Sequence, residues 1–288
     1  MKRIFIITIL AISSSLCFGQ TDSSKSPATD SVPPKSTLTL GTVYSNNASY
    51  YGERAEENTP YIAVAATYQL KSGIYFTGQT YKLLNDNSST LSASAIGAGV
   101  TLKVSKKLST DISYSHSFYP AYSPLLQAAN ADNASIVFSY NGWIKPSITG
   151  DYAFGKTADA FVTAGISKEI NLFSISNKDI ITITPSANVV AGTQHFYQTY
   201  LRQKSLRDSL LGILTDPIFG SPGNTGESKT VVNTYFNLLS YSLKLPLAYN
   251  RAHYLVEAAY QLSMLSPHAQ NGKGNLNSFL TFSFYYQF

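Results

Sequence analysis

Apolar and polar residues alternate along most of the chain from Ser36 onward, and this pattern constrains the fold more than any other feature. Successive side chains of a β-strand point to opposite faces, so a period of two predicts strands with one apolar and one polar face. We predict twelve strands, with ten or fourteen as alternatives, because each boundary can shift by about two to four residues. Pro185 predicts a bulge or a later strand start, because proline has no N–H for the ladder. The predicted strands are residues 36–46, 60–70, 74–84, 90–104, 109–118, 134–143, 147–154, 159–172, 179–199, 231–247, 253–265 and 277–288.

The connections between these strands alternate in length. Odd-numbered connections average about 13 residues and even-numbered ones about 4. Barrels of bacterial outer membranes have short turns on the periplasmic side and longer loops outside, and an even strand number returns both termini to the periplasm. In a soluble β-sandwich nothing requires long and short connections to alternate. The lengths therefore predict an antiparallel transmembrane β-barrel over residues 36–288, with both termini in the periplasm.

The composition supports strands that face lipid. The chain has 21 Tyr and 15 Phe, and only 13% of its residues are charged. That charged fraction is about half the usual share for a soluble domain. So many aromatic side chains need an apolar surrounding, and no stretch after the N-terminal one is long enough for a membrane helix. Strands closed into a barrel are the remaining way to satisfy the backbone in lipid.

The N-terminus has the layout of a secretory signal peptide. Lys2 and Arg3 precede an apolar stretch, Ile4–Leu10, and smaller residues follow up to the Gly19–Gln20 junction. We predict a signal peptide over residues 1–19 and a disordered periplasmic leader over residues 20–35, which is rich in Ser, Thr, Asp and Pro. The protein is thus expected in the outer membrane of a Gram-negative bacterium. Its 21 Lys and Arg against 16 Asp and Glu do not cluster, so we expect no nucleic-acid partner.

The last predicted strand shows the alternation best. One face has Leu280, Phe282, Phe284, Tyr286 and Phe288, and the other has Phe279, Thr281, Ser283, Tyr285 and Gln287. The first face is expected to contact outer-membrane lipid. A chain ending in an aromatic residue after alternating apolar positions resembles the C-terminal assembly signal of bacterial outer-membrane β-barrel proteins. The resemblance implies insertion by the barrel-assembly machinery, with Phe284, Tyr286 and Phe288 as its signal, and it identifies no subfamily.

Three charged residues are predicted to face the lumen: Lys244, Glu257 and Asp151. Lys244 and Glu257 lie on consecutive antiparallel strands, and one register pairs them directly. Two interpretations remain open. The pair is either a charged constriction in a pore or a structural ion pair that neutralises a filled lumen.

The sequence shows no catalytic or metal-binding pattern. Outer-membrane lipid hydrolases resemble one another in a His-x-Ser motif on a strand, and none of the four His residues here has Ser two positions later. Glu53, Glu56 and Glu57 form the one close acidic group, which we interpret as a solvated acidic loop rather than a weak Ca²⁺ site. We therefore expect no enzymatic activity, no metal and no cofactor.

The longest connection, Tyr200–Thr230, is expected to hold the specificity of the protein. Leu206, Leu210 and Leu214 recur at helical spacing and predict a short amphipathic helix in this extracellular loop. The leading hypothesis for function is a narrow porin-like channel or passive transporter for small polar solutes. The alternative is a non-enzymatic barrel that displays its loops for binding, adhesion or complex assembly, since the fold alone does not choose between them.

Overall fold

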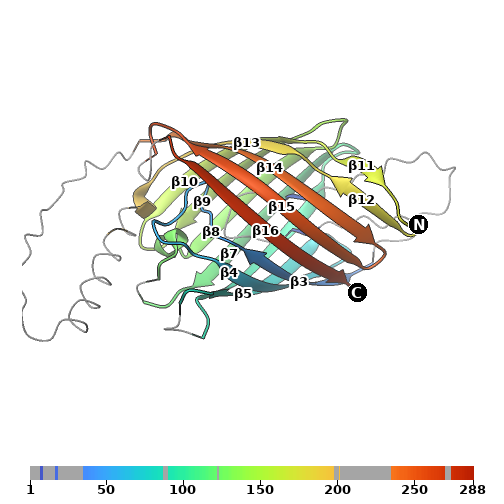
Figure 1. Ribbon diagram of the computed structural model, residues 1–288, viewed down its shortest axis with the longest axis horizontal. Coiled ribbons are helices and arrows are strands. Elements are labelled where there is room, and N and C mark those ends of the chain that lie inside the picture. Colours follow the sequence, from blue (N-terminus) through green and yellow to red (C-terminus); the bar gives the residue numbers. More distant parts are fainter. Residues whose placement is uncertain are drawn as a thin grey trace, which may run out of the picture.

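The chain forms a closed antiparallel β-barrel (Figure 1). The computed structural model describes residues 7–8, 17–18, 35–86, 90–121, 123–197, 201, 235–269 and 274–288. Each strand of the barrel pairs with its neighbours in antiparallel register, and the last, β16, pairs with the first, β3, which closes the wall. The wall strands are β3 (Thr37–Ser45), β4 (Tyr61–Gln69), β5 (Ile74–Leu83), β6 (Ala93–Lys103), β7 (Leu108–Phe118), β8 (Asp132–Tyr140), β9 (Lys145–Phe154), β10 (Ala158–Ser167), β11 (Ile170–Phe173), β12 (Asp179–Ile183), β13 (Ser186–Gly192), β14 (Asn237–Arg251), β15 (Tyr254–Leu265) and β16 (Leu276–Gln287).

The predicted number of twelve strands is confirmed for the part of the chain that the structure describes. β10 and β11 are two parts of one wall strand, and β12 and β13 are two parts of the next, because both β12 and β13 pair with β14. A separate pairing joins β1 (Ile7–Thr8) to β2 (Cys17–Phe18). The other residues of the predicted signal peptide and leader up to residue 34 lie outside the described residues.

The interruption between β12 and β13 contains Pro185. Pro246 of β14 lies opposite the same gap, so two residues without an N–H meet where the ladder is broken. The backbone N–H of Thr184 donates to the carbonyl of Pro246 (3.0 Å), and that of Lys168 donates to the carbonyl of Pro185 (3.1 Å). The bulge or later strand start predicted at Pro185 corresponds to this interruption within one wall strand, between Ile183 and Ser186.

The two faces of the wall differ in chemistry. Side chains that point outward are large and apolar, as Phe282 (48% exposed) and Phe284 (44%) are on β16. Phe279 (3%) and Tyr285 (2%) alternate with them and point into the barrel, which confirms the predicted phase of this strand. Most other inward positions have Ser, Thr, Gln, Asn, Ala or Gly. An apolar exterior around a polar interior is typical of a barrel that spans a membrane.

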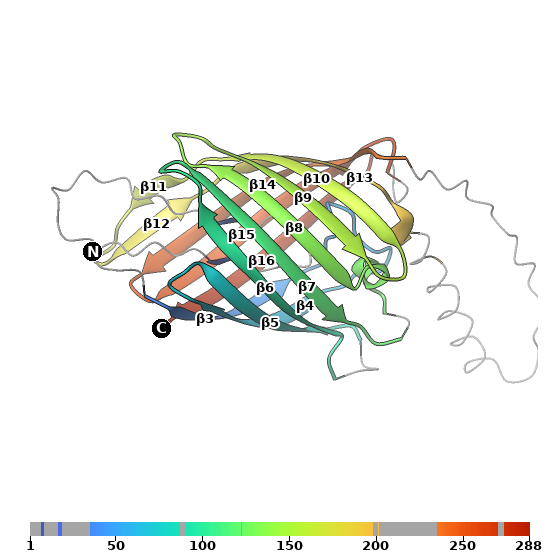
Figure 2. The ribbon, with the colours of Figure 1, turned by 180° about the vertical axis from the view of Figure 1, so that it is seen from behind.

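The connections divide by length between the two ends of the barrel. Both the start of β3 and the end of β16 lie at one end, where Phe288 N–H donates to the carbonyl of Leu38 (2.9 Å). This short-turn end has connections 70–73, 104–107, 141–144, 174–178 and 252–253. The long-loop end has 46–60, 84–92, 119–131, 193–236 and 266–275, with 155–157 as a short exception (Figures 1 and 2).

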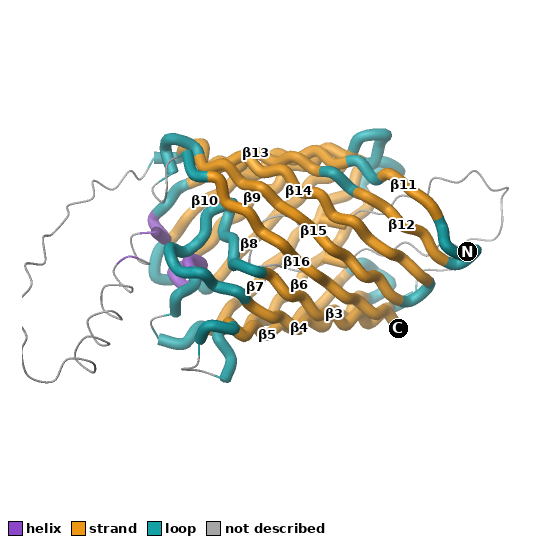
Figure 3. Tube along the Cα trace, viewed as in Figure 1, coloured by secondary structure: helices purple, strands orange, loops and turns teal. Residues whose placement is uncertain are grey.

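Helical structure in the described residues is confined to the long-loop end (Figure 3). It consists of η1 (Leu126–Ala129) and a short segment at residues 195–197, with residue 201 also helical. No described helix is both long enough and apolar enough to cross a membrane.

Candidate functional site in the barrel lumen

The first connection, residues 46–60, folds into the barrel instead of projecting away from it. Its tip is a tight turn, Tyr50–Glu53, which we call the lumen hairpin. Tyr50 N–H donates to Glu53 O (2.8 Å) and Glu53 N–H donates to Tyr50 O (3.0 Å). The two central residues, Tyr51 and Gly52, both have positive φ (51° and 86°), as a two-residue hairpin turn of type I′ requires. All four residues of the hairpin are buried.

The base of this connection is clamped by side chains. Asn47 Oδ1 accepts hydrogen bonds from the N–H (3.0 Å) and the hydroxyl (2.6 Å) of Thr59, and Thr59 Oγ1 accepts one from Ala48 N–H (3.1 Å). Asn46 Oδ1 accepts from the N–H of Leu280 on β16 (2.8 Å). These bonds join the two ends of the connection to each other and to the wall, so the direction of the lumen hairpin is fixed where it leaves the strands.

Contacts on separate stretches of the wall show that the lumen hairpin crosses the interior. Ser240 of β14 donates its hydroxyl to Tyr51 O (2.7 Å), and Asn277 of β16 donates its amide to Gly52 O (3.1 Å). Farther around the wall, across the lumen from β3 and β4, the Tyr51 ring stacks on Phe161 of β10 with centroids 3.6 Å apart. The Tyr51 hydroxyl also bonds to the carboxyl group of Asp151 on β9. The hairpin therefore lies across the lumen near its long-loop end.

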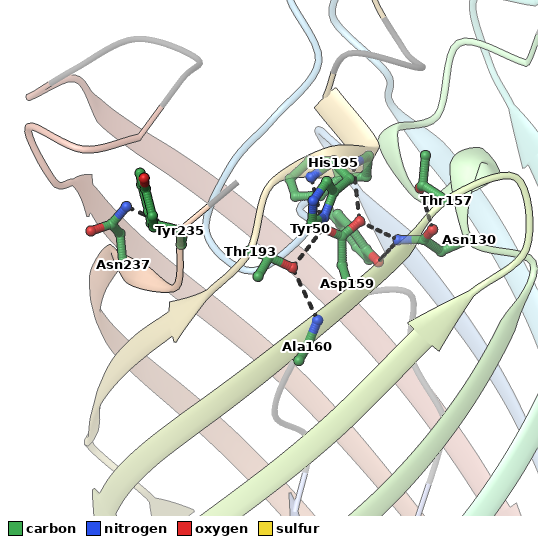
Figure 4. Close-up of polar contacts among 10 residues, drawn as sticks. Tyr50, Asn130, Thr157, Asp159, Ala160, Thr193, His195, Tyr235 and Asn237 are labelled. Atoms are coloured by element: carbon green, nitrogen blue, oxygen red, sulfur yellow. Dashed lines mark hydrogen bonds and ion pairs between the residues drawn. The ribbon is translucent and has the colours of Figure 1, made fainter. Parts of the chain in front are cut away.

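Asp159, at the start of β10, joins two connections, residues 119–131 and 193–236, beside the lumen hairpin (Figure 4). Its side chain is 1% exposed and accepts hydrogen bonds from Asn130 Nδ2 (2.8 Å) and Thr193 Oγ1 (2.7 Å). It also accepts from the backbone N–H groups of His195 (2.7 Å) and Phe196 (2.9 Å), which open the short helical segment. The His195 Nδ1 atom lies 3.0 Å from Asp159 Oδ1. An anionic acceptor at the N-terminus of a helical turn satisfies backbone donors that otherwise have no partner.

Apolar packing completes this arrangement. The Tyr50 ring meets Phe196 (centroids 4.9 Å apart) and Phe161 (5.7 Å) edge to face. Phe196 and Leu239 are fully buried, and Leu126 of η1 belongs to the same cluster. We call the lumen hairpin together with residues 126–130 and 193–197 the cap. The cap lies inside the lumen at the long-loop end.

Glu53 is the unusual member of the cap. Its side chain is 0% exposed, and both carboxyl oxygens lack a hydrogen-bond partner among the described residues. Burial, with the charge of Asp159 as a second cause, raises the pKa of Glu53 from 4.5 to about 8. The interpretation of Glu53, Glu56 and Glu57 as a solvated acidic loop is thus wrong for Glu53, although Glu56 is exposed. The error arises because Glu53 belongs to the turn that enters the lumen.

The lumen is more accessible away from the cap. Inward side chains in the middle of the wall, such as Thr77, Ser135 and Thr149, are half-buried, whereas several toward the short-turn end, among them Thr67, Asn250 and Tyr285, are buried again. Asp111 also faces this region and accepts hydrogen bonds from Tyr75 (2.8 Å) and Thr101 (2.7 Å). The cap therefore occupies the long-loop end of a lumen whose wall is largely polar.

The three charges predicted to face the lumen all point inward, but the predicted register is wrong. Lys244 lies opposite Gln261, and Glu257 lies opposite Ala248. β14 continues to Arg251, beyond the predicted end at Leu247, and residues 252–253 alone form the turn. Lys244 and Glu257 are therefore not directly paired across the strands, although each contributes to the electrostatic environment of the other.

Asp151 has a clearer place. It faces the lumen from β9 and hydrogen bonds to Ser135 and Asn133 of β8 as well as to Tyr51. Its carboxyl group thereby connects the wall to the lumen hairpin.

The remaining predicted site residues are on the outside of the barrel or beyond the described structure. Phe284, Tyr286 and Phe288 occupy the outward face of β16 and the chain end, and their role in assembly stays a prediction. Leu206, Leu210 and Leu214, together with the helix expected there, lie outside the described residues. The described residues contain no group of three or more His, Cys, Asp and Glu arranged to hold a metal ion.

The similarity of this chain to known proteins concerns the fold alone. No protein family and no curated protein matches the sequence. Among solved structures, the KdgM porin has 6% identity and a TM-score of 0.47, over 87% of this chain and 99% of that chain. The NanC porin has 7% identity and a TM-score of 0.45, over 86% of this chain and 98% of that one. LpxR from Salmonella typhimurium has 7% identity and a TM-score of 0.43, over 87% and 99%. At these values the likenesses give no information about function.

Proposed function

We propose that this protein is a porin-like channel of the outer membrane for small polar solutes, and that the lumen hairpin forms its constriction. The observation that supports this most directly is the position of the hairpin, which leaves the wall between β3 and β4 and reaches across a polar lumen to contacts with β9, β10, β14 and β16. Barrels of about eight strands are filled by side chains, whereas barrels of about sixteen leave an aqueous channel. A barrel of twelve strands lies between these limits, so an inserted turn can decide what passes.

The lining favours uncharged or weakly charged solutes. Hydroxyl and amide groups predominate on the inward face, and the carboxyl groups of Asp111 and Asp151 are occupied by neutral donors. Rings of exposed charge, which select ions in other pores, require unoccupied charged groups at the narrowest point. In this barrel the lumen hairpin, with the aromatic side chains of Tyr50 and Tyr51, occupies the narrowest point.

The remaining parts of the proposal concern the setting of the barrel. We place it in the outer membrane after removal of residues 1–19, with the short-turn end in the periplasm and the long-loop end outside. The barrel-assembly machinery inserts it, outer-membrane lipid contacts its apolar face, and it has no enzymatic activity.

The decisive experiment measures conductance of the purified barrel in planar bilayers, together with liposome swelling in polar solutes of increasing size. The informative variant replaces residues 49–57 with a short Gly-Ser linker and keeps the clamp formed by Asn47 and Thr59. We expect this variant to fold normally and to conduct more than the wild type. The matched control, Arg54→Ser with Glu56→Ser, changes exposed residues of the same connection and should conduct as the wild type does.

The buried cap also favours the second candidate function, a barrel that displays its loops to a partner. Phe196 and Leu239 are fully buried where a conducting pore would need an opening. If the variant without the lumen hairpin folds but conducts no more than an empty bilayer, the channel proposal is wrong and display becomes the better account.

A further inference from the structure

Glu53 combines three properties that suggest a role beyond narrowing the lumen. It ends the turn that crosses the lumen, its side chain is fully buried, and neither carboxyl oxygen has a hydrogen-bond partner among the residues that the structure describes. A carboxylate in such surroundings loses its hydration without compensation, whereas a protonated carboxyl group loses much less. A neutral Glu53 therefore favours the inserted position of the hairpin, and an ionised Glu53 disfavours it.

The groups around Glu53 reinforce this preference. Asp159 of β10 acts on it as a like charge. Asp151 of β9 also lies near the hairpin, through its bond to Tyr51, and Arg54, Glu56 and Glu57 follow Glu53 in the same connection. His195 lies against Asp159 and is the one imidazole among the described cap residues. The neighbours from β14, β15 and β16 at the turn, Ser240, Ser263 and Asn277, are uncharged.

We propose that the lumen hairpin is a proton-controlled gate, inserted while Glu53 is protonated and withdrawn from the lumen when Glu53 ionises. This inference rests on the proposed channel function for its physiological meaning, but the movement of the hairpin can be measured separately. The hairpin is held by hydrogen bonds, ring contacts and the packing of Tyr50 and Tyr51 in a buried apolar cluster, whereas the wall has its own ladder. The turn can therefore leave the lumen without breaking the wall, provided that the clamp at its base stays in place.

The direction of the pH effect follows from linkage. The pKa of Glu53 is raised to about 8 with the hairpin inserted, whereas a solvated glutamate in the withdrawn hairpin has the ordinary value of 4.5. Below about 4.5 both positions contain a protonated Glu53, so insertion is favoured fully. Between the two values the withdrawn position loses its proton first, and the preference for insertion falls steadily until about pH 8. Burial also raises the pKa of Tyr50 and Tyr51 well above 10, so these phenols stay neutral over that range.

The first test records conductance of the full-length barrel in planar bilayers from pH 4 to pH 9. We expect conductance of the wild type to rise between about pH 4.5 and pH 8. Glu53→Gln keeps the shape of the side chain but cannot ionise, so its conductance should stay low at every pH. Glu56→Gln, an exposed carboxyl group in the same connection, should respond as the wild type does. A pH response that survives in Glu53→Gln would overturn the proposal, and a separate His195→Gln variant would show whether His195 produces that response.

The second test follows the hairpin without using conductance. Ala55→Cys places a thiol at a buried position two residues after Glu53, and Glu56→Cys places one at an exposed position. The ratio of their labelling rates by a maleimide cancels the intrinsic pH dependence of thiols. We expect the ratio to rise severalfold between pH 5 and pH 8, and to stay constant when Glu53→Gln is added. A constant ratio without that substitution contradicts the gate. A rising ratio in a barrel that never conducts supports the gate and contradicts the channel function instead.

Discussion

Three carboxyl groups that face the lumen, those of Asp111, Asp151 and Asp159, are held largely by hydroxyl, amide and backbone N–H donors. Each one joins parts of the protein that the chain itself does not place together. Asp111 links neighbouring wall strands, Asp151 links the wall to the lumen hairpin, and Asp159 links the wall to the rest of the cap. Hydrogen bonds to a charged group are worth about 1.5–3 kcal/mol each, so these carboxyl groups act mainly as structural acceptors.

Asp159→Asn should loosen the cap and leave the wall intact. The substitution replaces one carboxylate oxygen, which accepts hydrogen bonds, with an NH₂ group, which cannot accept them. The donors that bonded to that oxygen lose their acceptor, and this destabilises the cap locally by about 1–3 kcal/mol. We expect faster hydrogen exchange at the backbone amides of His195 and Phe196, and unchanged exchange in the central residues of β10. Asp86→Asn, which alters a carboxyl group of another loop, is the control. Unchanged protection at both amides would show that Asp159 does not hold the cap.

At the level of elements, the strands could be predicted from the sequence, but the register and the path of the loops could not. A period of two is insensitive to small boundary errors, so the sequence predicts the two faces of β16 correctly. The end of β14 was missed because the turn uses Ala252, at φ 23°, where turn signals are usually Gly or Asn. The lumen hairpin was missed because the direction of a loop depends on distant partners such as Ser240 and Phe161. The aromatic pair Tyr50–Tyr51 beside Gly52, in an otherwise polar connection, was the available signal.

Gly52 should be one of the least replaceable residues of the lumen hairpin. Its φ of 86° costs a residue with a side chain about 1–2 kcal/mol, and an added Cβ would lie 2.5 Å from Ser240 Oγ. Gly52→Val is therefore expected to drive the hairpin out of the lumen and to raise conductance at acidic pH, where the wild type is closed. Gly78→Val on β5 is the control, because an added Cβ there meets nothing within 4 Å. Wild-type conductance in Gly52→Val would mean that the hairpin does not set the pore size.

The whole molecule consists of a wall that closes through its own backbone and a cap that is built on that wall. The seam between the first and last strands joins β3 to β16 through residues far apart in the sequence, from Thr39 opposite Gln287 to Ser45 opposite Thr281. No residue of the cap contributes to this ladder. Changes in the cap should therefore alter opening more than folding, whereas changes at the seam should alter folding and insertion.

Phe288 is where we expect the seam to be most sensitive. Its N–H donates to Leu38 O at the end of the β3–β16 ladder, and its ring is 64% exposed on the outward side, next to Tyr286. Phe288→Ser, or deletion of Phe288, should impair insertion while export continues, since the terminal aromatic residue belongs to the expected assembly signal. Leu276→Ser changes a residue of equal exposure (65%) at the opposite end of the same strand, and we expect it to insert normally. Heat-modifiable gel mobility of membrane fractions measures the folded barrel, and immunoblotting of the periplasm measures exported but uninserted chain. Recognition of the C-terminal residue predicts that folded barrel is lost in the Phe288 variants alone. Equal losses of folded barrel in Phe288→Ser and Leu276→Ser would instead indicate a general need for apolar surface.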